Sequence, residues 1–269
     1  MKNLFLVAAI IGAALTVTAA DVTEVKPVSK TGISFAEGKI GKAARFNDKS
    51  RLYFDSKYLN TAGGAVEMWV CPSAETPANK QNFLISNGTN NPTWFFWGFD
   101  ATKTNFLSRS KLPDQKFAHY SSISIGQNFP VDEWTHVALN WCNIEPSGSL
   151  VQLFVNGKVV IEKFDQTLSD GNDPKASSFG IGCNTSSTAN PGFVGLIDEL
   201  RVYNQPLSPK TIAENYNTVL GGKTLPCGDT VSLQLSFEDT LNGQSGASML
   251  PLKELQDKGN AILDEIVEE

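Results

Sequence analysis

The stretch of this chain best suited to ligand chemistry runs from Thr93 to Phe99 and reads Thr-Trp-Phe-Phe-Trp-Gly-Phe. Successive strand residues point to opposite faces of a sheet, and here both faces carry aromatic rings. If Trp94 points inward, Trp97 and Phe99 lie on the other face, where flat rings stack on sugar C–H surfaces; the opposite phase exposes Trp94. Trp94, Trp97 and Phe99 are therefore the predicted ligand-binding residues. The alternative is that residues 103–128 fold over this face and bury it.

The acidic residues do not form a pattern expected of a glycoside hydrolase. Such catalysis needs two or three carboxylates aimed into one cleft. Asp198 and Glu199 are adjacent, so they face opposite ways, and no Glu-x-Asp-x-x-Glu pattern occurs. We expect Glu199 to form a surface pair with Arg201 and Asp198 to anchor a loop or contact an ion. We predict no catalytic residues and no enzymatic activity.

The net charge argues against a nucleic-acid partner, and the first residues indicate an exported protein. The formal net charge is −6, and no concentrated cationic face is available for nucleic acid. Residues 1–20 combine a Lys near the start, an apolar middle and small residues at the end, which predicts a secretory signal cut near Ala19 or Ala20. A membrane anchor is the alternative, but the apolar run is shorter than the ~20 residues of a spanning helix. We predict a secreted, periplasmic or cell-surface protein with no membrane span after cleavage.

The four cysteines lie in the predicted exported part, where oxidation favours disulfides. Their spacing fits no zinc motif, and they allow three pairings. We favour two bridges that each join the end of one strand to a later segment: Cys142 with Cys183, and Cys71 with Cys227.

Apolar and polar residues alternate with the period of two that indicates strands. Residues 151–162 predict a hairpin with Asn156-Gly157 in a type I′ turn. Ser208 and Pro209 predict the start of a short helix. Residues 103–128 are interpreted as loops plus one weak strand at 120–125. Clean alternation at 65–72 and 193–203 places two sets of residues each on one face: Val66, Met68 and Val70 in the first strand, and Leu196, Asp198, Leu200 and Val202 in the second.

Residues 195–204, Gly-Leu-Ile-Asp-Glu-Leu-Arg-Val-Tyr-Asn, resemble the closing signature of LamG-like jelly-roll domains. Residues 38–54 resemble the entry motif of that family, and Trp134 to Ala138 its Trp-x-His-Val-Ala strand. The resemblance implies that His136 makes a structural hydrogen bond. The resemblance implies the concanavalin A-like lectin and glucanase superfold: an all-β, two-sheet antiparallel jelly-roll sandwich with one short helix after the last family strand. This superfold hosts lectins, adhesion modules and hydrolases alike, so it implies a fold more directly than a function.

The resemblance also implies a bound calcium ion, because many members hold one hard cation with loop carboxylates and carbonyls. The candidate ligands are Asn47, Asp48 and Asp198. The alternative is that these residues serve ordinary turn chemistry.

The residues after the short helix are unusual for such a domain. Residues 229–238 alternate as a strand, and we hypothesise that this strand enters the sandwich in place of a weak one within residues 21–37; the alternative is a second, truncated repeat. Residues 252–267 predict a helix that Gly259 interrupts. The predicted organisation is a signal peptide at 1–20, a jelly-roll domain at 21–240, and a C-terminal tail with a helix at 241–269.

These observations predict a non-catalytic binding module that recognises carbohydrate through aromatic and loop residues at one face. One alternative is a protein-adhesion or structural module of the cell surface, whose partner is an extracellular protein. The other alternative is a glycoside hydrolase.

Overall fold

The computed structural model describes residues 22–75, 82–87, 94–99, 104–109, 120–123, 129–144, 148–165, 177–183 and 192–268. At 94–99, 104–109 and 120–123 the description concerns the backbone. The predicted signal at 1–20 lies outside the described residues.

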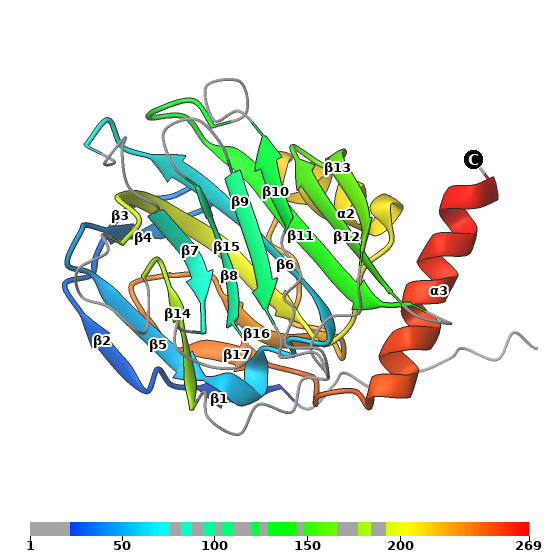
Figure 1. The fold of residues 1–269 in the computed structure, drawn as a ribbon. Helices are drawn as coiled ribbons and strands as arrows, with labels where there is room; N and C mark the ends of the chain where they lie inside the picture. Colours follow the sequence, from blue (N-terminus) through cyan, green and yellow to red (C-terminus); the bar gives the residue numbers. More distant parts are fainter. Residues whose placement is uncertain are drawn as a thin grey trace, which may run out of the picture.

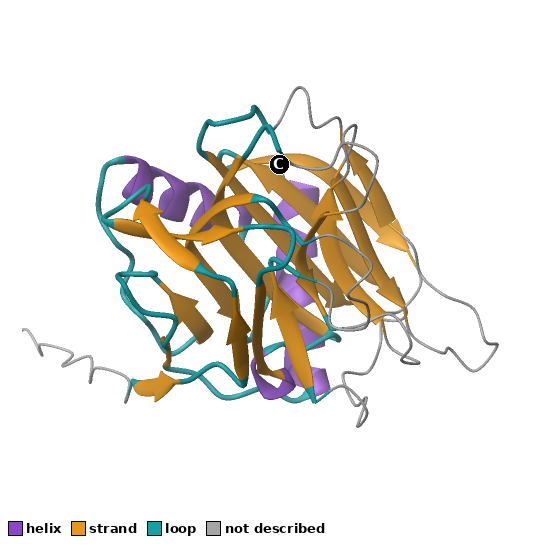
Figure 2. Ribbon diagram, turned by 90° about the vertical axis from the view of Figure 1, so that its left-hand side faces the viewer, coloured by secondary structure: helices purple, strands orange, loops and turns teal. Residues whose placement is uncertain are grey.

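In the described part of the chain, seventeen strands form two antiparallel sheets, as the all-β jelly-roll prediction requires (Figure 1). Strands dominate the molecule in the second view as well (Figure 2). The ten-stranded sheet contains β1 (Thr23–Val25), β3 (Ser34–Glu37), β4 (Lys42–Phe46), β6 (Gly63–Pro72), β11 (Thr135–Asn143), β12 (Ser149–Val155), β13 (Lys158–Asp165), β15 (Gly195–Tyr203), β16 (Val231–Leu235) and β17 (Gly243–Ser245).

The seven-stranded sheet has the order β10-β9-β8-β7-β14-β5-β2. Its strands are β2 (Ser29–Thr31), β5 (Arg51–Asp55), β7 (Asn82–Ser86), β8 (Trp94–Phe99), β9 (Thr104–Arg109), β10 (Tyr120–Ile123) and β14 (Ser178–Ile181). The described helices are the short 3-10 helix η1 (Ser56–Tyr58), α2 (Pro209–Leu220) and α3 (Leu252–Glu268).

The core lies between the sheets and is built from the alternating residues of both. Val66, Met68 and Val70 of β6 are fully buried in it, which confirms their predicted common face. From the opposite sheet, Leu52 and Ile181 contribute to the same cluster. Burial of each such side chain stabilises the fold by about 1.5–3 kcal/mol relative to exposure.

A β-bulge in β15 changes the predicted face of two residues. Glu199 has a φ of 48°, and the pairing of β15 with β6 shifts register between Asp198 and Arg201. Leu200 and Val202 lie in the core as predicted, whereas Leu196 and Asp198 pair with Cys71 and Trp69, outside the core cluster. The prediction that Leu196 and Asp198 share a face with Leu200 was wrong, because an extra residue on one strand reverses the alternation beyond it.

The C-terminal strand enters the sandwich as hypothesised, but it does not replace an N-terminal strand, because residues 21–37 themselves form β1, β2 and β3. β16 pairs antiparallel with β15, beside the part of β15 that pairs with β4. β17 pairs with β16, and the N-terminal β1 pairs with β17 at the edge. Leu233 and Leu235 of β16 are fully buried in the main core. The domain boundary at residue 240 remains a prediction.

Two helices cover the outer face of the ten-stranded sheet. Ser208 caps α2 by accepting a hydrogen bond from the Thr211 amide at 3.1 Å, as its sequence predicts. α3 stands against β11 and β6 (Figure 1). Gly259 does not interrupt α3, contrary to the prediction; it lies inside the helix where the helix approaches β11.

Candidate functional site

The aromatic strand β8 lies inside the seven-stranded sheet, between β7 and β9. Trp97 is in register with Ile85 of β7, and Phe96 is in register with Ser86. Ile85 belongs to the main core cluster. The side chains of Trp94, Trp97 and Phe99 lie outside the described part of the structure, so their ligand-binding role stays a prediction.

The structure does not bring the three predicted calcium ligands together. Asn47 and Asp48 follow the end of β4, and Ile197 pairs with Ala44. Asp198 therefore lies about four residues, roughly 13 Å, from Asn47 along the strand pair. Among the described residues, no group of three or more His, Cys, Asp or Glu side chains is placed to hold a metal ion.

Asn47 takes part in a turn. Its side-chain amide donates to the Gly32 carbonyl at 3.1 Å, and its side-chain oxygen accepts from the Lys49 amide at 2.9 Å. The Ser50 hydroxyl also donates to the Gly32 carbonyl. These bonds tie the β4–β5 turn to the turn between β2 and β3.

Asp198 anchors a loop, as the sequence indicates. Its buried carboxylate accepts hydrogen bonds from the amides of Ile40, at 3.0 Å, and Glu199, at 2.7 Å. A Cβ atom at Gly38 would lie 2.7 Å from the carboxylate, so the loop needs glycine there. Burial raises the pKa of Asp198 to about 7, against the opposing effect of the amide donors.

A buried polar cluster lies between β6, β11, β15 and α2. Glu67 accepts hydrogen bonds from the Tyr203 hydroxyl and, at 3.0 Å, from the Asn215 amide, and it lies 3.4 Å from the Nε2 atom of His136. Burial acts to raise the pKa of Glu67, but the hydrogen bonds and charges of its neighbours, His136 foremost, outweigh it and hold the pKa below its usual value. His136 thus has a structural partner in the Glu67 carboxylate.

Glu199 and Arg201 form an ion pair of 2.8 Å, but the pair is buried and not on the surface as predicted. The loop after α2 covers it, since the Leu225 carbonyl accepts a hydrogen bond from Arg201 at 3.0 Å. Charged residues such as Glu and Arg are mostly exposed, so the sequence pattern favoured a surface pair. It could not show that a loop distant in sequence would cover the two side chains.

The predicted disulfides do not form: Cys71, Cys142, Cys183 and Cys227 are all free thiols in the structure. Cys142 packs with Ile262 of α3 outside the ten-stranded sheet, whereas Cys183 follows β14 of the other sheet. The Cys142–Cys183 prediction was therefore wrong because the two thiols belong to different layers. Burial raises the pKa of Cys142 to about 12, so it stays protonated at neutral pH.

The predicted Cys71–Cys227 bridge was also wrong. Cys71 lies near the end of β6, where it pairs with Leu196. Cys227 packs against the cluster of Ala65 and Tyr203, six residues back along β6. At about 3.3 Å per residue, roughly 20 Å of strand separates the two positions, far beyond disulfide reach.

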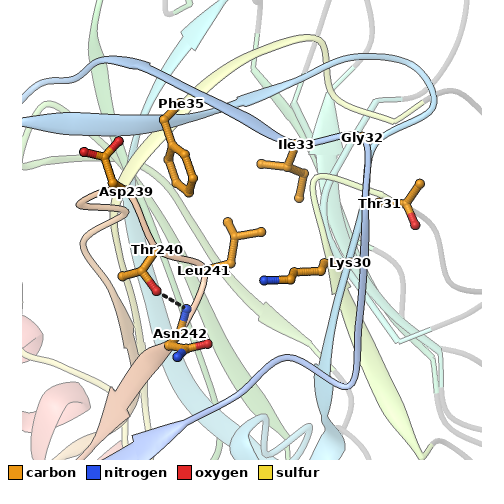
Figure 3. Close-up of a pocket in the computed structure, with 9 residues that line it drawn as sticks. All are labelled: Lys30, Thr31, Gly32, Ile33, Phe35, Asp239, Thr240, Leu241 and Asn242. Carbon is orange, nitrogen blue, oxygen red and sulfur yellow. Dashed lines mark hydrogen bonds between the residues drawn. The ribbon is translucent and has the colours of Figure 1, made fainter.

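A cavity of about 380 Å³ lies at the edge of the sandwich and was not predicted (Figure 3). One wall is the segment from β2 into β3, and the other is the loop between β16 and β17. No local sequence pattern indicated this cavity, because its two walls come from opposite ends of the chain. The lining residues are Lys30, Thr31, Gly32, Ile33, Phe35, Asp239, Thr240, Leu241 and Asn242.

Comparison with protein families gives one match, which covers more than half of the chain. A family model described as the concanavalin A-like lectin/glucanases superfamily matches residues 46–213. A search of curated proteins found no match. In the part of the chain that the structure describes, the helices lack the continuous apolar length that a membrane span requires.

Solved structures share the architecture at low identity. Domain 4 of a GH43 extracellular arabinanase from Geobacillus stearothermophilus, solved with arabinotriose, matches with a TM-score of 0.49 and 28% identity over 72% of this chain and 86% of that one. The binding domain of Paraclostridial Mosquitocidal Protein 1 matches with a TM-score of 0.51 and 13% identity, over 72% of this chain and 47% of that one. The receptor binding domain of botulinum neurotoxin mosaic serotype C/D matches with a TM-score of 0.52 and 11% identity, over 74% of this chain and 46% of that one. The two toxin domains, about half of whose length this chain spans, show a shared fold.

Proposed function

Because this chain belongs to the concanavalin A-like lectin/glucanases superfamily, we propose that it is a non-catalytic module that binds carbohydrate on the outer face of the seven-stranded sheet. The superfamily contains both binding proteins and hydrolases, so the function has to be inferred from the residues of the site and not from the fold. The observation that carries the proposal is the backbone register of β8, which puts an aromatic-rich strand inside this sheet.

The register supports Trp94 as the sugar-stacking residue. Directly paired residues of neighbouring strands share a face. Trp97 pairs with Ile85, a core residue, so positions 97 and 99 belong to the core register and position 94 to the outer one. We therefore favour the phase in which Trp94 meets the ligand and Trp97 and Phe99 support it from below.

The positions of the three buried carboxylates favour binding over hydrolysis. Glu67 is buried beneath α2, Glu199 beneath the loop that follows α2, and Asp198 beneath the β3–β4 loop, and each already has hydrogen-bonding or charged partners. A hydrolase needs two carboxyl groups facing one bound sugar. These three carboxylates support the outer layer of the fold instead.

The adhesion alternative has one observation in its favour. On the edge strand β13, Val159, Val160 and Phe164 are 41%, 40% and 52% exposed. An edge strand with apolar side chains is suited to pair with another protein. The two functions are separated by measuring whether glycan binding depends on these three residues. Glycan binding that does not depend on them favours the carbohydrate-binding function.

The proposal is tested by tryptophan fluorescence titration against a panel of soluble oligosaccharides. We expect at least one of them to quench the wild-type protein, and Trp94→Ala to weaken that binding roughly tenfold or more, the effect of losing one large apolar contact. Trp134→Phe is the matched control, because Trp134 precedes β11 in the other sheet. Unchanged binding by Trp94→Ala, or no quenching by any member of the panel, would contradict the proposal.

We further propose that the module acts outside the cytoplasm, as a secreted, periplasmic or cell-surface protein. The signal-like pattern of residues 1–20 supports this location. N-terminal sequencing of the exported protein is expected to begin near residue 20 or 21. An intact N-terminus on membrane-bound protein would contradict cleavage.

A further inference from the structure

The cavity between the β2–β3 segment and the loop 236–242 has walls that are held in place. Gly32, with a φ of 67°, turns the chain between β2 and β3, and its carbonyl accepts hydrogen bonds from Asn47 and Ser50. A ligand entering the cavity therefore meets a wall that is already ordered, which lowers the entropic cost of binding.

The opposite wall is held from three sides. Phe237 is fully buried in the core, the Glu238 carboxylate accepts from the Lys42 amide at 3.2 Å, and the Asn242 side chain donates to Glu24 at 2.8 Å. Phe237 and Asp239 both have a positive φ, 57° and 54°, without being glycine. Backbone conformations of this kind persist only where the surroundings impose them, and they are common at ligand sites.

The lining is apolar at its base and polar at its rim. Ile33 and Phe35 pack against the main core, and Leu241 belongs to it. The polar groups of the lining are the Lys30 ammonium, the Asp239 carboxylate and the Thr240 hydroxyl. In Figure 3 the Lys30 side chain extends across the opening toward the loop 239–242, and Asp239 lies at the opposite end of the lining with its carboxylate pointing away from Lys30. Among the described residues, neither charged group has an ion-pair or hydrogen-bond partner.

We propose that this cavity binds a polyhydroxylated ring, the end residue of a glycan chain. The C–H face of such a ring matches the apolar base, and its hydroxyls match the rim. The Asp239 carboxylate accepts from hydroxyls, and the Lys30 ammonium and the Thr240 hydroxyl donate to ring or hydroxyl oxygens. The volume of about 380 Å³ lies within the ordinary range of small-molecule pockets.

This site is separate from the aromatic strand. β8 and β2 lie four strand spacings apart in the seven-stranded sheet, about 19 Å. None of the residues lining the cavity is a tryptophan, so binding there is expected to leave tryptophan fluorescence unchanged. The two sites can therefore be tested independently, and failure of one leaves the other standing.

The test is isothermal titration calorimetry, with saturation-transfer NMR for weak ligands, on the exported chain. The probes are methyl glycosides of glucose, galactose, mannose, arabinose, glucuronic acid and N-acetylglucosamine. We expect at least one to bind the wild type and the Trp94→Ala variant equally. Lys30→Met and Asp239→Asn are each expected to weaken it at least tenfold, because each removes a charged hydrogen-bonding group.

Lys210→Met is the matched control, since Lys210 is an exposed lysine of α2 outside the cavity. The lysine and aspartate variants change exposed side chains, and unaltered melting temperatures will show that all variants fold. If the Lys30→Met and Asp239→Asn variants bind the methyl glycoside with the same affinity as the wild type, the proposal is overturned. Binding of none of the six glycosides by the folded wild type would overturn it as well.

Discussion

Gly259 of α3 lies directly against Cys142 of β11: a Cβ atom at position 259 would stand 2.8 Å from the Cys142 sulfur and 2.8 Å from the Asn143 carbonyl oxygen. Glycine normally weakens a helix interior by about 1 kcal/mol relative to alanine. Here it allows α3 to approach the sheet closely, which explains why a residue expected to interrupt the helix lies inside it.

Gly259→Ala is therefore expected to destabilise the protein by about 1–3 kcal/mol, because overpacking at the contact outweighs the gain in helix propensity. Urea unfolding measures the change. Gly228→Ala is the control, since a Cβ atom there meets nothing within 4 Å, and little change is expected. A more stable Gly259→Ala protein would show that α3 does not dock as described.

Arg201→Met is expected to cost about 3–5 kcal/mol, because it leaves the Glu199 carboxylate buried without its cation. Guanidinium unfolding provides the measurement. Lys253→Met breaks the exposed Lys253–Asp257 pair of equal length, 2.8 Å, and is expected to cost less than about 1 kcal/mol. If the two variants lose similar stability, the Glu199–Arg201 pair is not buried in solution.

Asp198 gives the protein a distinct pH dependence. Burial raises its pKa from the usual 3.8 to about 7, so between these values the folded protein holds a proton that the unfolded chain has released. Stability from this group therefore falls as pH rises from about 4 to 7, by on the order of 2 kcal/mol between pH 5 and pH 7. Glu67, whose pKa is lowered, loses its contribution only at more acidic pH and does not interfere.

The comparison of wild type with Asp198→Asn isolates this contribution. Unfolding free energies of both proteins are measured at intervals from pH 5 to pH 8. We expect the wild type to become less stable relative to the variant as pH rises. Parallel curves for the two proteins would refute the raised pKa.

The local patterns of the sequence were sufficient for much of the fold. Asn156 and Gly157 form the hairpin turn with φ values of 49° and 76°, as their types predict. Ser208 caps α2, and the alternation of β6 separates core from outer residues. Each of these features depends on neighbours within a few residues, which is why sequence alone could indicate them.

Features that depend on distant partners were missed. β9, at Thr104–Arg109, lies in a stretch interpreted as loop, and its pairing with β8 and β10 overrides its weak strand preference. The bulge at Glu199, the free cysteines and the cavity around Lys30 and Asp239 likewise arise from tertiary contacts. The candidate sugar-binding residues were predicted by type, but choosing between Trp94 and Trp97 required the register of β7 and β8.

Binding of the protein to a broad glycan array, with folding verified by circular dichroism, tests the central claim most directly. We predict a β-rich spectrum and reproducible binding to at least one class of glycan, weakened in the Trp94→Ala variant. A folded protein that binds no glycan on the array would contradict the assignment of this chain as a carbohydrate-binding module.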